Sequence, residues 1–125
     1  MLFTHDLQST LAPIVAHYPQ TQICLLSSLY PPYIHLTSIG CDYPLLAIPD
    51  GEENKTIETV ERIWNFLLEH HITRQGLLVN IGGGLTTDLG GFAAATYKRG
   101  IDFLNIPTTL LAMVDASTGG KTGFN

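Results

Sequence analysis

Glycines 82–84 form the segment of this chain best suited to hold a phosphate through its backbone. They follow the apolar run Leu77–Ile81 and precede a stretch of small residues. A helix N-terminus presents unpaired N–H groups, and glycine lets a phosphate approach them closely. The strict pattern G-x-G-x-x-G is not met, because Thr87 stands in place of its third glycine. The residues alone are compatible with a phosphate-binding turn or with a plain tight turn.

A second segment with binding chemistry surrounds Lys121. Gly120-Lys121-Thr122 resembles the end of a P-loop, but Asp115 occupies the place of that motif's first glycine and no strand directly precedes it. A nucleotide triphosphatase is therefore not indicated. The Lys121 ammonium could reach a phosphate or carboxylate, and Asp115 could accept hydrogen bonds from substrate hydroxyls or orient the lysine. Taken singly, each charge would normally be a solvated surface group.

Residues 50–55 (DGEENK) form a third polar segment, which follows the apolar run Leu45–Ile48. Glu52 could accept a hydrogen bond from a ribose hydroxyl, and Lys55 could hold a phosphate. By itself the segment is more typical of the polar lead-in to a helix that begins at Ile57.

No metal site is predicted within the chain. The five histidines are scattered, and the neighbours His70 and His71 point about 100° apart on a helix. The two cysteines, Cys24 and Cys41, lack metal-like spacing, and Cys24 is expected to be a small buried hydrophobe.

The hydrophobic pattern alternates between strands and helices. Strands are expected at 23–26, 45–48, 77–81 and 101–106, and helices at 6–17, 57–71 and after the glycine turn. Residues 27–44 are expected to form a loop. This order predicts an α/β fold with a Rossmann-like doubly wound parallel sheet. Ligands bind at the carboxyl ends of the strands in such sheets, where 82–84 and 108–109 would lie.

The helix after the glycine turn has an unusual composition. Thr86 or Thr87 is expected to cap its N-terminus, with Asp88 in the first turn and Gly100 at its C-terminal end. Its sequence LGGFAAATYK is rich in glycine, which costs ~1 kcal/mol relative to alanine in a helix. We expect the two glycines, at 90 and 91, to let another backbone or a cofactor come close.

Composition limits the classes of partner. A chain of 125 residues is one domain's worth, and its net charge of −5 argues against nucleic-acid or anionic-membrane binding. No apolar run approaches the ~20 residues that cross a bilayer. Two cysteines indicate no disulfide framework, and the first ten residues lack the pattern of a signal peptide. A cytoplasmic protein is expected.

The order of these segments resembles that of 3-dehydroquinate synthases, the sugar-phosphate cyclases of the shikimate pathway. DGEENK resembles the family's DGE-x-x-K element, and GGGLTTDLGGFAAATYKRG resembles its nucleotide-binding turn and helix. IPTTLLAMVDASTGGKTGFN resembles its substrate-facing segment, so the resemblance runs from about residue 47 to residue 125. It implies a dehydroquinate synthase-like N-terminal domain, here truncated.

The resemblance also implies a site. Asp115 and Lys121 would be catalytic and face an acidic seven-carbon sugar phosphate. The implied reaction converts 3-deoxy-D-arabino-heptulosonate 7-phosphate to 3-dehydroquinate with release of phosphate. NAD transiently oxidises a substrate hydroxyl in that scheme, and a divalent metal, zinc or cobalt, polarises it. The implied NAD contacts are Asp50, Gly51, Glu52, Lys55, Gly83, Gly84, Leu85, Thr86, Thr87, Asp88, Thr108, Thr109 and Lys121.

Three features depart from the family pattern. Thr87 replaces a glycine, and LLSSLYPP lacks the acidic residue that the family carries after its first strand. The family's metal ligands, a glutamate and two histidines, belong to a C-terminal helical domain beyond Asn125. We therefore expect residues 1–125 to be an incomplete NAD-binding domain without activity by itself, and the full-length form to be a homodimer. The alternatives are a related cyclase of another pathway, a metal-dependent alcohol dehydrogenase of similar fold, and a non-catalytic NAD-binding fragment.

Overall fold

The part of the chain that the structure describes folds around a four-stranded parallel sheet. The computed structural model describes residues 12–28 and 43–107. The strands lie in the order β2-β1-β3-β4, and every pairing is parallel. Their bounds are Ile23–Ser28 for β1, Leu45–Ile48 for β2, Leu77–Gly82 for β3 and Asp102–Pro107 for β4. The predicted α/β class with a parallel sheet is confirmed.

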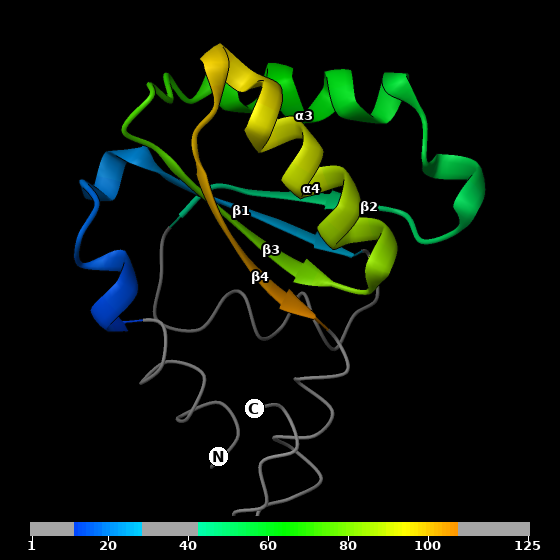
Figure 1. Cartoon of the computed structure of the whole chain (residues 1–125), viewed down its shortest axis with the longest axis horizontal. Helices are drawn as coiled ribbons and strands as arrows, with labels where there is room; N and C mark the ends of the chain where they lie inside the picture. Colours follow the sequence, from blue (N-terminus) through cyan, green and yellow to red (C-terminus); the bar gives the residue numbers. More distant parts are fainter. Residues whose placement is uncertain (1–11, 29–42, 108–125) are drawn as a thin grey trace, which may run out of the picture.

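Two helices cross one face of this sheet, as Figure 1 shows. They are α3 (Ile57–Glu69), which connects β2 to β3, and α4 (Gly84–Thr96), which connects β3 to β4. The described residues also form three short 3-10 turns, η1 (Gln20–Gln22), η2 (Glu52–Asn54) and η3 (Tyr97–Arg99). Of the helix expected at 6–17, residues 12–15 are helical and residues 6–11 lie outside the described residues.

The central strands β1 and β3 are buried along their whole length. Their side chains alternate between two apolar clusters. Cys24, Leu26 and Leu78 belong to the cluster beneath α3 and α4. The second cluster, on the other face, contains Ile23, Leu25, Leu77, Val79, Ile81 and Ile106, with Val15 and Tyr18 packed against it. Burial on both faces explains why these strands read as continuous apolar runs.

The described strands extend slightly beyond their predicted ends. β1 continues to Ser28, β3 includes Gly82, and β4 runs from Asp102 to Pro107 rather than from 101 to 106. β2 has the predicted bounds. Because β1 lies between β2 and β3, its carboxyl end is held against both neighbours.

Residues next to helix α3 determine where it begins and ends. The Thr56 hydroxyl caps it by accepting a hydrogen bond from the Thr59 amide at 3.2 Å. Its buried face includes Val60, Ile63 and Leu67, as the helical spacing predicts. The helix ends at Glu69, two residues before the predicted end, and His71 has a positive φ of 57°.

Helix α4 begins earlier than predicted. Gly83 is its N-cap and makes no side-chain capping bond, so the expected caps at Thr86 and Thr87 were wrong. Asp88 therefore lies beyond the first turn. The reason is that glycines allow the backbone to enter the helix directly, while the Thr87 hydroxyl bonds back to the carbonyl oxygens of Gly83 and Gly84, each at 3.2 Å. The expected C-terminal cap of this helix at Gly100 was also wrong, because α4 ends at Thr96 with Tyr97 as its C-cap. Gly100, with a φ of 111°, is instead the C-cap of the following turn η3.

Gly90 and Gly91, the two glycines inside α4, are in close contact with side chains and not with another backbone. A Cβ at Gly90 would lie 2.0 Å from the Asn80 Oδ1 atom, and one at Gly91 would lie 3.3 Å from the Phe103 ring. The close approach was predicted, but its partners are residues of β3 and β4.

Trp64 joins the two helices. Its indole Nε1 lies 3.2 Å from both the Ala93 carbonyl oxygen and the Thr96 hydroxyl, which are acceptors near the end of α4. The α3–α4 contact is therefore fixed by a directional bond as well as by apolar packing.

Burial of Cys24 has a consequence for stability at high pH. Its side chain is fully buried, and desolvation raises the pKa of the thiol from 9.0 to about 12. Above pH 9 the unfolded thiol loses its proton while the folded one keeps it. The free energy of unfolding should therefore fall, by up to about 1.4 kcal/mol per pH unit from this group, between pH 9 and 12.

Urea denaturation of the chain and of Cys24→Ala at several pH values from 7 to 11 measures this contribution. The stability difference between the two proteins should shift in favour of Cys24→Ala above pH 9. Parallel pH curves would show that the thiol titrates normally.

Candidate functional site

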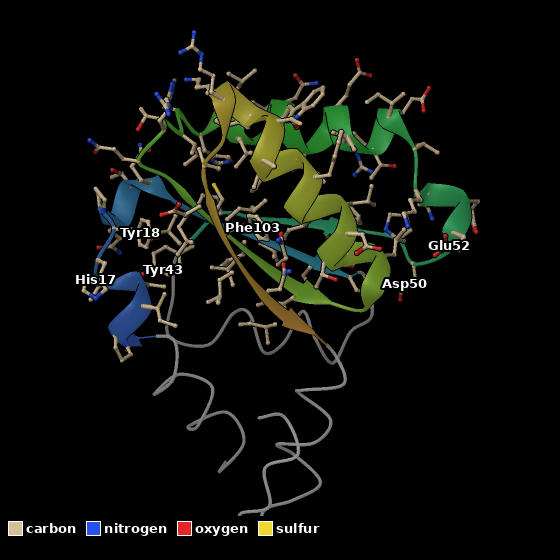
Figure 2. The ribbon with its side chains drawn as sticks, viewed as in Figure 1. His17, Tyr18, Tyr43, Asp50, Glu52 and Phe103 are labelled. Atoms are coloured by element: carbon tan, nitrogen blue, oxygen red, sulfur yellow. The ribbon has the colours of Figure 1, made fainter. Side chains whose placement is uncertain are left out.

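The carboxyl ends of the strands form one edge of the molecule, where α4 begins (Figure 1). Ser28 ends β1, residues 50–55 follow β2, and Gly82–Gly84 follow β3. Figure 2 shows Asp50 and Glu52 at this edge, at the opposite end of the sheet from Tyr18 and Tyr43. Two of the three polar segments singled out in the sequence therefore meet at the predicted edge.

The glycine turn has a closed side and an open side. A Cβ at Gly82 would lie 2.7 Å from the Thr86 side chain, so this glycine is needed for close packing of α4 on β3. A Cβ at Gly84 would meet nothing within 4 Å, so the first residue of α4 faces open space. Because Gly83 provides no side-chain cap, the first N–H groups of the helix are available to an anion at the open side.

The side chains after the turn serve mainly to hold it. Thr86 is fully buried, and its hydroxyl oxygen has no hydrogen-bond partner among the described residues. Leu85 packs against the cluster beneath the helices, and Thr87 bonds back to the turn. A ligand at the open side would thus meet the backbone of residues 83–87 rather than these side chains.

An ion pair joins the two predicted cofactor segments. The Lys55 Nζ lies 3.3 Å from the Asp88 Oδ2, which bridges the loop after β2 to α4. The side chains are 48% and 60% exposed, and such pairs contribute only about 0–1 kcal/mol to stability. The pair therefore adds little to the stability of the fold, and it joins the loop after β2 to α4.

The loop after β2 is held by Asp50. Both carboxylate oxygens of Asp50 lie 2.9 Å from the Ser28 hydroxyl, and its carbonyl accepts from Asn54 Nδ2 at 3.0 Å. Gly51 has a φ of 116° and the Glu53 carboxylate folds over it, so a side chain at 51 would be strained and crowded. Glu52 stays exposed at the tip.

Two features of this edge were missed by the sequence reasoning. Ser28 anchors Asp50, and Asn80 lies buried inside β3. A polar side chain at the end of, or within, an otherwise apolar strand is the signal that could have indicated both.

The remaining predicted residues lie outside the described residues. These are Thr108, Thr109, Asp115 and Lys121. Within residues 12–28 and 43–107, no group of three or more His, Cys, Asp and Glu side chains could hold a metal. The same part of the chain has no helix long and apolar enough to cross a membrane.

The edge offers groups that could hold a dinucleotide. It offers free helix amides above an open glycine, a lysine beside them, and exposed carboxylates at residues 50, 52 and 53 for ribose hydroxyls. In parallel sheets this combination holds a pyrophosphate at the helix and a ribose at a neighbouring strand end. The described residues offer no ligand set for zinc or cobalt.

Known proteins resemble this chain over about two thirds of its length. The family model described as "3-dehydroquinate synthase N-terminal" matches residues 45–125. The 3-dehydroquinate synthase of Sulfurovum sp. (strain NBC37-1) is 59% identical over 81 residues, which are 65% of this chain and 23% of that protein. The 3-dehydroquinate synthase of Campylobacter curvus (strain 525.92) is 53% identical over 91 residues, 72% of this chain and 26% of that protein. The chain spans about a quarter of the length of these relatives.

Solved structures show the same fold. A 2-deoxy-scyllo-inosose synthase complexed with carbaglucose-6-phosphate, NAD+ and Co2+ matches with a TM-score of 0.66 and 27% identity, over 86% of this chain and 32% of that one. ValA, a 2-epi-5-epi-valiolone synthase from Streptomyces hygroscopicus subsp. jinggangensis 5008 with NAD+ and Zn2+ bound, matches with a TM-score of 0.59 and 29% identity. That match covers 82% of this chain and 31% of ValA.

The closed and open sides of the turn predict opposite responses to a methyl group. Gly82→Ala should lower the free energy of unfolding by about 1–3 kcal/mol, because the methyl collides with Thr86. Gly84→Ala should leave stability unchanged or raise it by up to about 1 kcal/mol, because the methyl enters open space and restricts the unfolded chain. Urea denaturation of both variants tests this, and equal losses of stability would contradict it.

Proposed function

Because the chain belongs to the 3-dehydroquinate synthase N-terminal family, we propose that it is the NAD-binding part of a 3-dehydroquinate synthase. The proposed enzyme converts 3-deoxy-D-arabino-heptulosonate 7-phosphate to 3-dehydroquinate and releases phosphate. The ion pair between Lys55 of the DGEENK segment and Asp88 of α4, the helix that begins at the glycine turn, carries this proposal. The names of the relatives and the NAD+ in the titles of two neighbouring structures support it.

The chain's own residues would bind and orient the cofactor. NAD, when bound, supplies a hydride acceptor that oxidises a substrate hydroxyl and later returns the hydride. The amides of Gly83 and Gly84 would hold its pyrophosphate, with Lys55 adding positive charge at that edge. Asp50 would keep the loop in place, and Glu52 would accept from a ribose hydroxyl.

Asp115 and Lys121 are proposed to face the substrate. The lysine would hold a phosphate or carboxylate of the sugar acid, and the aspartate would accept from its hydroxyls or orient the lysine. Both lie outside the described residues, so their roles rest on the family's motif alone.

The complete enzyme is proposed to need a divalent metal, as Co2+ and Zn2+ in the related cyclases suggest. In the part of the chain that the structure describes, no group of side chains could hold that metal. We therefore propose that residues 1–125 alone do not turn over substrate. A cytoplasmic location and a homodimeric full-length form are part of the same proposal.

A second candidate is a cyclase that acts on a different sugar phosphate. The matches to 2-deoxy-scyllo-inosose synthase and ValA favour it, since both are cyclases with the same fold. The higher identity to proteins named 3-dehydroquinate synthase favours the first candidate. Product analysis of a complete protein that contains this chain, with each sugar phosphate in turn, separates the two.

NAD binding tests the proposal directly. Isothermal calorimetry on the purified chain should show saturable binding that Lys55→Ala weakens by about tenfold, because the cation is lost and the Asp88 carboxylate is left unpaired. Arg62→Ala removes another exposed cation, from α3, and should change the affinity by less than about twofold. A folded chain that binds no NAD would refute the proposal.

The charge of the loop after β2 predicts which dinucleotide is preferred. Asp50, Glu52 and Glu53 lie together where a ribose would be held, so the 2′-phosphate of NADP would meet like charge. NADP should bind at least about tenfold more weakly than NAD. Glu52→Gln should reduce this difference in affinity, because it removes one of the negative charges. Equal affinities for NAD and NADP, measured by isothermal calorimetry, would mean that the ribose does not lie beside these carboxylates.

A further inference from the structure

Two amide side chains connect the strands on either side of the glycine turn. Asn80 on β3 lies opposite Asn105 on β4, and its Nδ2 donates to the Asn105 Oδ1 at 3.0 Å. Asn80 is two residues before Gly82, and Asn105 is two residues before Pro107. The amide pair therefore lies just below the edge where the proposed cofactor site begins.

Asn80 also determines how α4 lies on the sheet. Gly90 leaves room for the Asn80 amide, whose Oδ1 is 2.0 Å from the place a Cβ would take. One helical turn earlier the arrangement is reversed, since Thr86 of α4 packs against Gly82 of β3. On each of the two elements, β3 and α4, a glycine therefore makes room for a polar side chain of the other element. Two such contacts along one helix restrict both its rotation and its sliding on β3.

Core packing alone does not explain an asparagine at this position. Asn80 is fully buried in a strand whose other residues from Leu77 to Ile81 are apolar, and a buried amide is unfavourable unless it is hydrogen-bonded. Its Nδ2 is satisfied by Asn105, while its Oδ1 has no hydrogen-bond partner among the described residues. Polar groups retained in this way can specify one arrangement among several apolar alternatives.

We propose that Asn80 is a positioning residue, which sets the glycine turn relative to the end of β4 through Asn105 and Gly90. The inference rests on the proposed NAD-binding function of that turn. Asn80 does not touch the cofactor. It fixes the height and angle of the α4 N-terminus, and thereby the direction of the amides at 83 and 84.

Asn105 is the point at which to test this, because its side chain is exposed and can be changed without filling the core. Asn105→Leu removes the acceptor, whereas Asn105→Gln keeps an amide acceptor on a longer side chain. In ¹H–¹⁵N spectra without NAD, Asn105→Leu should displace the amide signals of Gly83 and Gly90, and Asn105→Gln should leave them near their original places. Changes confined to the neighbours of residue 105 would overturn the proposal.

NAD affinity gives the functional readout. Asn105→Leu should weaken binding by about fivefold, comparable to the loss of one hydrogen bond, and Asn105→Gln should remain within about twofold. If the unaltered chain binds no NAD while the Gly83 and Gly90 signals still move, the proposed function fails and the positioning role stands. Unchanged affinity in a chain that does bind NAD would overturn the role in cofactor binding.

A second variant covers the case in which Asn105→Leu fails to fold, because it leaves the Asn80 amide unpaired. Asn80→Ala combined with Asn105→Leu removes both amides, so neither is left without its partner. The same displacement of Gly83 and the same loss of affinity are expected. A folded double variant with unchanged Gly83 and unchanged NAD affinity would overturn the proposal.

Discussion

The structure depends on the packing of α4 directly on β3. β3 pairs with β1 on one side and β4 on the other, and it is buried throughout. Its last residue, Gly82, must be small because Thr86 presses against it, and α4 begins two residues later. The turn from β3 into α4 is therefore short, and the contact between Thr86 and Gly82 holds it against the sheet. Its amides lie at the edge of the sheet where β1 and β2 also end.

The same edge is held by contacts between distant parts of the sequence. Ser28 anchors Asp50 at the start of one loop, and Lys55 reaches Asp88 on the helix. Neither contact contributes much apolar burial, because Asp50, Lys55 and Asp88 are all exposed. A stable core beneath a polar edge of this kind is the usual division between scaffold and site in parallel α/β proteins.

Sequence periodicity was sufficient for the scaffold. β2 has its predicted bounds, and β3 and α3 begin at the predicted residues, because buried parallel strands and amphipathic helices leave strong patterns. The start of α4 was misjudged, because threonine is a common cap while Gly83 enters the helix without one. Asn80 was read as part of an apolar run. Its partner Asn105 is 25 residues away, and no local pattern records such a pairing.

Trp64 gives the α3–α4 contact a spectroscopic consequence. It is the single tryptophan of the chain, and its indole nitrogen bonds to the far end of α4 from the glycine turn. Indole emission responds to the loss of such bonds and to entry of water. Any tilt of α4 that opens its contact with α3 would therefore alter the intrinsic fluorescence, so the chain carries its own optical reporter of helix position.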